Sequence, residues 1–157
     1  MTAVAFVRAA SSADLPVLVE LMRGYYRDDG LSFDAGRAAA TMERLLAEPQ
    51  WRGAWLLEAD GVIAGYIAIC MGFSLELGGN DAYIDELFVL PEYRGSGYGR
   101  LLTDFAAEAI AARGCVALLL EVDRENDSAL RLCAALGYER RDRYFLMTRR
   151  LSPARSS

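Results

Sequence analysis

Histidine is absent from this 157-residue sequence, and cysteine occurs only three times. Without imidazole the chain cannot build Ser-His-Asp or Cys-His nucleophile pairs, so a general base must be a carboxylate, a tyrosine, a cysteine or water. The cysteines show no C-x-x-C spacing and lie in apolar surroundings, which favours reduced thiols over a zinc site or a disulfide framework. We therefore expect no metal centre.

Long apolar runs are also missing. No run approaches the ~20 residues that span a membrane, and the N-terminus lacks the basic start and apolar stretch of a signal peptide. The formal charge of −5 argues against non-specific nucleic-acid binding and favours a cationic small partner. We expect a cytoplasmic protein that binds neither membrane nor nucleic acid, with one domain at residues 1–151 and a short tail at residues 152–157.

Alternating helix and strand patterns predict the element order βααβββαβαββ. This order is typical of an α/β (mixed α+β) fold, in which helices flank a central, mixed but mostly antiparallel sheet. The segment 116–122 is apolar on both faces, as a central strand would be. Strands are expected at residues 3–9, 54–59, 62–73, 82–89, 116–122, 138–141 and 144–151, and helices at residues 15–28, 35–48, 98–113 and 127–136.

The stretch from Ala82 to Leu102 joins a strand, a glycine-rich loop and a helix. The first turn of a helix has unpaired N–H groups and the positive end of the helix dipole, and glycines let a phosphate approach that backbone. Arg94 and Arg100 add positive charge at the loop, so the pattern predicts a pyrophosphate site. A P-loop lysine is missing, and Arg100 replaces the third glycine of a dinucleotide fingerprint. A dinucleotide site and a purely structural turn remain the alternatives.

Arg94-x-x-Gly97-x-Gly99, behind a strand that ends at Val89, resembles the acyl-CoA-binding motif of the GNAT superfamily of N-acetyltransferases. Downstream, Asn126-x-x-Ala129-x-x-Leu132-Cys133-x-x-x-Gly137-Tyr138 resembles the second signature of the family. The likeness covers nearly the whole chain. It implies a GNAT-like acyl-CoA N-acyltransferase fold, acetyl-CoA as co-substrate without a metal, an amine acceptor and, commonly in the family, a homodimer.

The resemblance also assigns the cofactor site. It implies that the strands at residues 82–89 and 116–122 splay apart and that pantetheine enters the gap, pairing with the backbone of Phe88 and Val89. Asn126 has two compatible roles, as a helix N-cap and as a ligand of the pantetheine arm. The implied cofactor-binding residues are Leu87, Phe88, Val89, Arg94, Gly95, Ser96, Gly97, Tyr98, Gly99, Arg100 and Asn126.

Two adjacent carboxylates, Asp85 and Glu86, are the candidates for removing a proton from the amine, which is mostly ammonium at neutral pH. As neighbours in a strand they should point to opposite faces unless a bulge intervenes. The resemblance places the first acidic position in the cleft, so Asp85 is preferred to Glu86. The alternative is that either carboxylate pairs with Arg94 or another arginine.

Cys133 stands where the family usually has a tyrosine that protonates the departing thiolate. The cysteine is therefore either a replacement acid or a core residue, and Tyr83, Tyr144 or water could supply the proton instead. The resemblance implies an acceptor site that borders Tyr25, Tyr26, Asp28, Asp29, Phe33 and Tyr83.

These observations predict an N-acetyltransferase that moves an acetyl group to a primary amine of a small cationic molecule, by direct transfer with a carboxylate base. Two alternatives stay open. One is a non-catalytic acyl-CoA-binding regulatory module, and the other is a protein N-acetyltransferase.

Overall fold

The structure, a computed structural model, describes residues 4–152 and divides into two compact units. The first unit comprises residues 1–122 and the second residues 123–157. The expectation of one domain over residues 1–151 stays a prediction, and most of the tail at residues 152–157 lies outside the described residues.

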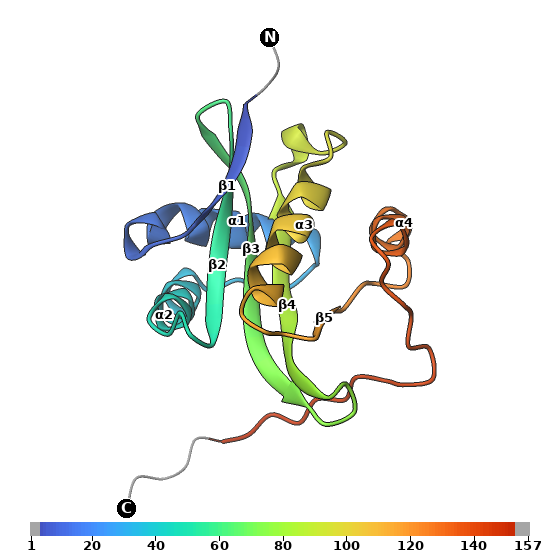
Figure 1. The fold of residues 1–157 in the computed structure, drawn as a ribbon. Coiled ribbons are helices and arrows are strands. Elements are labelled where there is room, and N and C mark those ends of the chain that lie inside the picture. The colour runs from blue at the N-terminus through green and yellow to red at the C-terminus, as the bar shows by residue number, and fades with distance from the viewer. Residues whose placement is uncertain (1–3, 153–157) are drawn as a thin grey trace, which may run out of the picture. The chain divides into compact units, whose positions relative to one another are not determined.

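The first unit contains one five-stranded sheet in the order β1-β2-β3-β4-β5 (Figure 1). Four strands, each antiparallel to the next, are β1 (Ala5–Ala9), β2 (Arg52–Ala59), β3 (Val62–Ser74) and β4 (Gly79–Val89). The fifth, β5 (Ala117–Leu120), runs parallel to β4. Between β2 and β3, Asp60 and Gly61 have φ of 51° and 79°, as a two-residue hairpin turn requires. The predicted mixed, mostly antiparallel sheet is confirmed.

Helices cover both faces of this sheet. On one face, α1 (Leu15–Asp28) and α2 (Ala35–Leu46) pack apolar side chains against Leu56, Tyr66 and Phe88. On the other face, α3 (Tyr98–Ala111) packs against a cluster that includes Trp55 and Ile67. Burying each large apolar side chain contributes roughly 1.5–3 kcal/mol, so the two clusters fix both helix layers. None of the helices in residues 4–152 is long and apolar enough to cross a membrane.

The helix boundaries follow from capping residues. Asp34 Oδ1 accepts a hydrogen bond of 2.8 Å from Arg37 N and so caps the start of α2. Before α1, Ser11 and Asp14 enclose a single 3-10 turn, η1 (Ser12–Asp14), in which Asp14 accepts from Ser11 N at 2.8 Å. A second 3-10 turn, η2 (Pro91–Tyr93), follows β4.

The expectation of a central strand at residues 116–122 is wrong in position and length. In the described residues β5 covers only Ala117–Leu120 and pairs with β4 alone, so it lies at the sheet edge. All four of its residues are half-buried. Apolar residues on both faces are typical of a central strand, but packing against helices can bury them at an edge as well.

The second unit contains α4 (Asp127–Ala135). Asn126 Oδ1 caps the helix by accepting from Ala129 N at 3.1 Å, and Gly137, with φ of 84°, ends it. The hairpin expected at residues 138–141 and 144–151 is wrong, because residues 138–152 contain no strand in the structure. A strand is stable only with a partner and a surface to pack on, yet Phe145 and Met147 are 80% and 89% exposed.

Candidate functional site

A β-bulge in β4 determines which way the two adjacent carboxylates point. Across β3 and β4, Ala68 lies opposite Glu86 and Ile69 opposite Ile84, so Asp85 is the extra residue. Before the bulge, Ile84 packs in the core under α3, whereas after it Glu86 bonds to Tyr66 in the core under α1 and α2.

Asp85 lies close to groups on the α1–α2 side. Its negative charge raises the pKa of Tyr25, Tyr26 and Cys70, which all pack on that side. The bulge is the exception to strict alternation that the sequence left open, so Asp85 and Glu86 need not point to opposite faces.

Glu86 is a buried carboxylate held by a phenol. Only 7% of the residue is exposed, and its Oε2 accepts a hydrogen bond of 2.5 Å from the hydroxyl of Tyr66. Burial raises the pKa of Glu86 above its ordinary value, and the hydrogen bond from Tyr66 partly opposes this. The neighbouring charge of Asp85 raises this pKa as well.

Asp85 itself reaches solvent, but surrounding protein atoms partly desolvate its carboxylate. This desolvation raises the pKa of Asp85, and the negative charge of Glu121, on the segment after β5, raises it further. Neither Asp85 nor Glu86 has an arginine within salt-bridge distance in the part of the chain that the structure describes. The two carboxylates thus form an acidic pair without a counter-charge.

Tyrosines surround this pair. Tyr25 and Tyr26 come from the last turn of α1, and burial raises the pKa of both phenols, with the charge of Glu86 adding to the effect. The hydroxyl of Tyr83 on β4 is buried and has no hydrogen-bond partner in the described residues, although Glu121 lies near enough to raise its pKa. All three phenols therefore stay protonated at neutral pH and are available as donors.

A glycine lets α1 approach β4 closely enough to build this site. A Cβ on Gly24 would lie 2.6 Å from Cζ of Phe88, so only glycine permits this spacing without a shift. The next residues along α1 are Tyr25 and Tyr26, whose rings meet edge to face at a centroid distance of 5.7 Å. Phe33 in turn packs edge to face against Tyr26 at 5.5 Å, as its predicted place beside the acceptor site suggests.

Asp28 lies in a different environment from the other predicted acceptor residues. Its Oδ2 accepts from Nη2 of Arg94 at 2.6 Å, while Nε of Arg94 donates to the carbonyl of Val89 at 2.8 Å. Arg94 thus links the end of α1 to the end of β4. Among the alternatives from the sequence, the pairing of Arg94 with Asp85 or Glu86 is wrong in this structure.

The glycine-rich loop has the open backbone that a phosphate site requires. Gly95 and Gly97 have φ of 79° and 82°, and an added Cβ at either would meet nothing within 4 Å. The helix α3 starts with Tyr98, and the first helical bond runs from Leu101 N to Gly97 O at 3.0 Å. The amides of residues 98–100 therefore have no helical carbonyl as partner. Arg100 pairs with Asp104 at 3.5 Å, but both side chains are more than half exposed and can reorient.

The strands β4 and β5 diverge beside this loop. Their pairing runs from Asp81–Ala117 to Ile84–Leu120 and stops there, so residues 85–89 have no partner on this side in the described part of the chain. The splay that the resemblance implied is present. The same open edge contains Leu87, Phe88 and Val89, three of the predicted cofactor residues.

Asn126 and Cys133, the two predicted site residues of the second unit, have local roles that the structure defines. Asn126 is the N-cap of α4. Cys133 is half-buried, and burial raises the pKa of its thiol, so the sulfur is protonated at neutral pH. The predicted roles of Asn126 toward pantetheine and of Cys133 as an acid stay predictions.

Two residues beside the carboxylates were missed from the sequence, Tyr66 and Cys70. Both lie on β3 and face the α1–α2 side. The hairpin register gives the signal that could have found them: Tyr66 pairs with Phe88 and Cys70 with Tyr83. A polar side chain that falls next to a carboxylate in an otherwise apolar strand is a site candidate.

The sequence and the structure both match known proteins. A sequence model described as the Acetyltransferase (GNAT) family matches residues 17–138. The bovine (Bos taurus) thialysine N-epsilon-acetyltransferase is 39% identical over 59 residues, which are 38% of this chain and 35% of that protein. The chain thus aligns with about a third of the length of this protein and of the mycothiol acetyltransferase of Thermobispora bispora, which is 35% identical over 91 residues.

Solved structures match over almost the whole chain. An integron cassette protein from the mobile metagenome of a salt marsh at Cole Harbour has 30% identity and a TM-score of 0.82, over 94% of this chain and 91% of that one. The aminoglycoside N-acetyltransferase AAC(6')-Iy in complex with CoA has a TM-score of 0.82, over 96% and 98% of the two chains. At 18% sequence identity, this structural likeness shows a shared fold and no more.

Proposed function

The chain belongs to the GNAT acetyltransferase family, and from this premise we propose that it transfers an acetyl group from acetyl-CoA to a primary amine of a small cationic molecule. The observation that carries the acceptor class is the pair Asp85 and Glu86, adjacent at the bulge of β4 and without an arginine within salt-bridge distance among residues 4–152. An ammonium group would supply the missing positive charge and stabilise both carboxylates in their ionised form. The bovine relative, by its name, acts on the ε-amine of thialysine, which supports an acceptor of this kind.

The cofactor site that we propose follows the loop and the open edge of β4. The open positions at Gly95 and Gly97, together with the free amides at the start of α3, fit a pyrophosphate group. Ser96 and Arg100 border the same loop, and the backbone of residues 87–89 offers groups for the pantetheine arm. Acetyl-CoA would bring an activated thioester carbonyl.

In the proposed reaction the carboxylates act on the amine first. Asp85 takes a proton from the ammonium group through water, and its raised pKa brings it nearer the pH at which it works. The free amine attacks the thioester carbonyl and the C–N bond forms. As the C–S bond breaks, the nitrogen loses its second proton, which passes through water to replace the proton that the thiolate receives. Backbone N–H groups near Val89 would stabilise the oxyanion.

The departing thiolate then needs a proton. Within the first unit, the buried hydroxyl of Tyr83 has no partner in the described residues and is a candidate donor. Cys133, which replaces the usual tyrosine of the family, is the candidate in the second unit. Its thiol is protonated at neutral pH, so both groups carry the proton that the step requires.

An amine panel at two pH values tests the activity. Thiol release from acetyl-CoA is measured with a cationic diamine, a lysine-like amine and a neutral aryl amine. We expect the cationic amines to be the better substrates at low salt, because the site is acidic. Equal or better rates with the aryl amine would contradict the proposed acceptor class.

The cysteine at position 133 supports one further candidate, a non-catalytic module that binds acyl-CoA. In that case calorimetry detects acetyl-CoA binding, but no amine in the panel produces thiol above the background rate. A protein N-acetyltransferase would instead be active on peptides and inactive on small amines. The proposed cytoplasmic location and homodimer rest on the sequence.

A pair of matched glycine variants tests the cofactor site. Gly97→Val puts a branched side chain where a phosphate would lie, and we expect it to abolish CoA binding. Gly78→Val is the control, since Gly78 has nearly the same backbone, φ of 84° against 82°, and equally open space, but lies in the β3–β4 turn. If both folded variants bind CoA as the wild type does, the loop is not part of the site.

A further inference from the structure

We propose that Tyr66 is a positioning residue that fixes Glu86 as the anchor for the ammonium group of the acceptor, which leaves Asp85 as the carboxylate that removes the proton. This inference rests on the proposed amine acceptor. It gives the two adjacent acids different roles: Glu86 binds the ammonium group, and Asp85 removes its proton.

The geometry around Tyr66 makes it a rigid donor. Its side chain is fully buried, and its ring packs near Phe88 with centroids 6.5 Å apart, in the cluster that includes Leu18 and Leu56. From this fixed ring the hydroxyl donates to Glu86 at 2.5 Å. In the register Tyr66 lies opposite Phe88, two residues beyond Glu86, so the bond runs diagonally between the strands. Glu86 therefore has a defined orientation before any ligand arrives.

The groups that act on the pKa of Glu86 are acids and phenols. They are Tyr66 on β3, Tyr25 and Tyr26 on α1, Asp29 directly after α1, and Asp85 on β4. Burial and the two neighbouring acids raise the pKa of Glu86, whereas hydrogen bonding by the phenols lowers it. The pKa of Tyr66 is itself strongly raised by burial, so its hydroxyl remains a donor throughout the working range. Arg37 on α2 lowers the pKa of Tyr26 and so partly opposes the effect of burial.

Exposure separates the roles of the two acids. A proton-removing group must exchange its proton with solvent, and Asp85 reaches solvent. Glu86 is buried and already accepts from Tyr66, so it is better suited to hold a charge than to carry a proton away. An ammonium group placed between the two acids would contact both, and only Asp85 could pass the proton to bulk water.

The test uses Tyr66→Phe, which removes one oxygen and keeps the ring packing. In the wild type and the variant, the titration of Glu86 is followed by ¹³C NMR of its carboxyl carbon, identified with Glu86→Gln. We expect the midpoint to rise by about 0.5–1 pH unit, since a hydrogen bond to a carboxylate is worth roughly 1 kcal/mol.

Calorimetry on the ligand-free protein tests the anchor without any turnover. We expect Tyr66→Phe to weaken binding of 1,5-diaminopentane about fivefold to tenfold near pH 7 and to leave binding of neutral aniline unchanged. The double variant with Glu86→Gln should bind the diamine no more weakly than Glu86→Gln alone, because Tyr66 acts through Glu86. With an active amine, KM should rise while kcat stays within about twofold.

Thr103→Val is the matched control, because it also removes a buried hydroxyl, one that donates to the carbonyl of Gly99 at 2.8 Å. It should change neither the midpoint of Glu86 nor diamine binding. The proposal is overturned if Tyr66→Phe leaves the midpoint unchanged, if diamine and aniline lose affinity equally, or if the wild type does not bind the diamine. If Tyr66→Phe does not fold, Glu86→Gln alone must lose the same diamine selectivity. A wild type that binds the diamine but acetylates no amine refutes the proposed function and leaves the anchor standing.

Discussion

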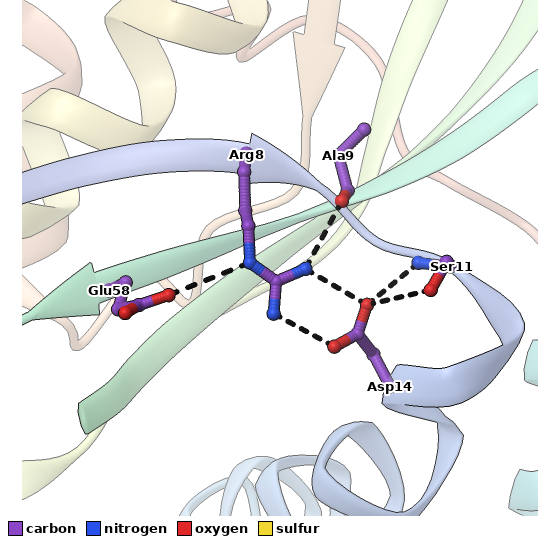
Figure 2. A network of polar contacts seen from close by, with 5 residues as sticks. All are labelled: Arg8, Ala9, Ser11, Asp14 and Glu58. Carbon is purple, nitrogen blue, oxygen red and sulfur yellow. Dashed lines mark hydrogen bonds and ion pairs between the residues drawn. The ribbon is translucent and has the colours of Figure 1, made fainter. Parts of the chain in front are cut away.

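The first unit has two clusters of carboxylates on one sheet, and their environments are opposite. In the first cluster, shown in Figure 2, the guanidinium of Arg8 binds both oxygens of Asp14 at 2.8 and 3.0 Å. Arg8 Nε also lies 3.6 Å from Glu58, and Ser11 donates to Asp14 through its amide and its hydroxyl. These contacts hold the pKa of Asp14 at about 2. The cluster joins β1, β2 and the start of α1.

In the second cluster the same residue types have no such partner. Asp85 and Glu86 have no arginine within salt-bridge distance in the described residues, and burial raises the pKa of both. A fully paired carboxylate contributes to folding, whereas an unpaired and partly desolvated one reduces stability and is retained where a ligand completes it. The difference supports the proposal that the second cluster is the site, whereas the first cluster stabilises the fold.

The largest expected effect comes from a substitution that disrupts the second cluster. Asp85→Asn should lower turnover by roughly 10²–10⁴ at neutral pH, the usual scale for loss of a general base. The loss should shrink at high pH, where more of the amine is neutral. Asp14→Asn removes an acid of the same type from the paired cluster and should leave turnover near the wild-type value. Near-normal rates for both Asp85→Asn and Glu86→Gln, measured by thiol release, would exclude a role for the pair in proton removal.

Breaking the first cluster should affect stability instead. Arg8→Met leaves Asp14 and Glu58 without their shared cation, and we expect the free energy of unfolding to fall by ~1–2 kcal/mol. Denaturant titration measures this change. Glu86→Gln is the counterpart, since its amide oxygen can still accept from Tyr66, and it should leave stability equal or slightly higher. A larger loss in Glu86→Gln than in Arg8→Met would reverse the comparison.

The pH dependence of stability should differ in sign between the clusters. The folded-state pKa of Asp14 is lowered from 3.8 to about 2, so its contribution is complete above about 4 and is lost as the pH falls toward 2. The folded-state pKa of Asp85 is raised, so its contribution is present at low pH and is lost as the pH rises above 3.8. Unfolding free energies of Asp14→Asn and Asp85→Asn, each minus the wild type, should therefore diverge from pH 3 to 6. Parallel curves would show that the two acids have similar environments.

Salt should have the smallest effect and should again separate the clusters. Screening weakens the attraction of Arg8 for its two acids, so added NaCl should reduce the stability difference between wild type and Arg8→Met by a few tenths of a kcal/mol. The repulsion between Asp85 and Glu86 is screened as well, and the preference for cationic over neutral amines should decline. Stability and amine preference measured at about 0.05 and 0.5 M NaCl test this. A cationic preference that grows with salt would contradict an electrostatic origin.

Local signals in the sequence were sufficient for most of the first unit. Three such features depend on the backbone of only a few consecutive residues, so the local sequence is enough to indicate them. They are the cap at Asp34, the Asp60-Gly61 turn and the glycines before Tyr98. The glycine-rich loop was also predicted from a local motif, and the end of the β4–β5 pairing at Ile84–Leu120 agrees with the splay that the family resemblance implied.

The features that could not be predicted from the sequence depend on contacts between residues far apart in the chain. The bulge at Asp85 follows from the pairing of β4 with β3, and no residue type within β4 indicates its position. Tyr66 joins Glu86 only through that register. The hairpin expected at residues 138–151 had the right alternation, but alternation shows only that a segment could form a strand, and partners decide whether it does.

The open edge of β4 at residues 85–89 also bears on solubility. A sheet edge that is available to a ligand is equally available to another polypeptide, and the apolar, aromatic run Leu87–Val89 has the composition of an aggregation-prone strand. Asp85, which reaches solvent, lies at the start of this edge and would disfavour such pairing, because two copies of the edge would bring two negative charges together. The carboxylate that is proposed to take a proton from the amine would therefore also oppose association of the chain with its own copies.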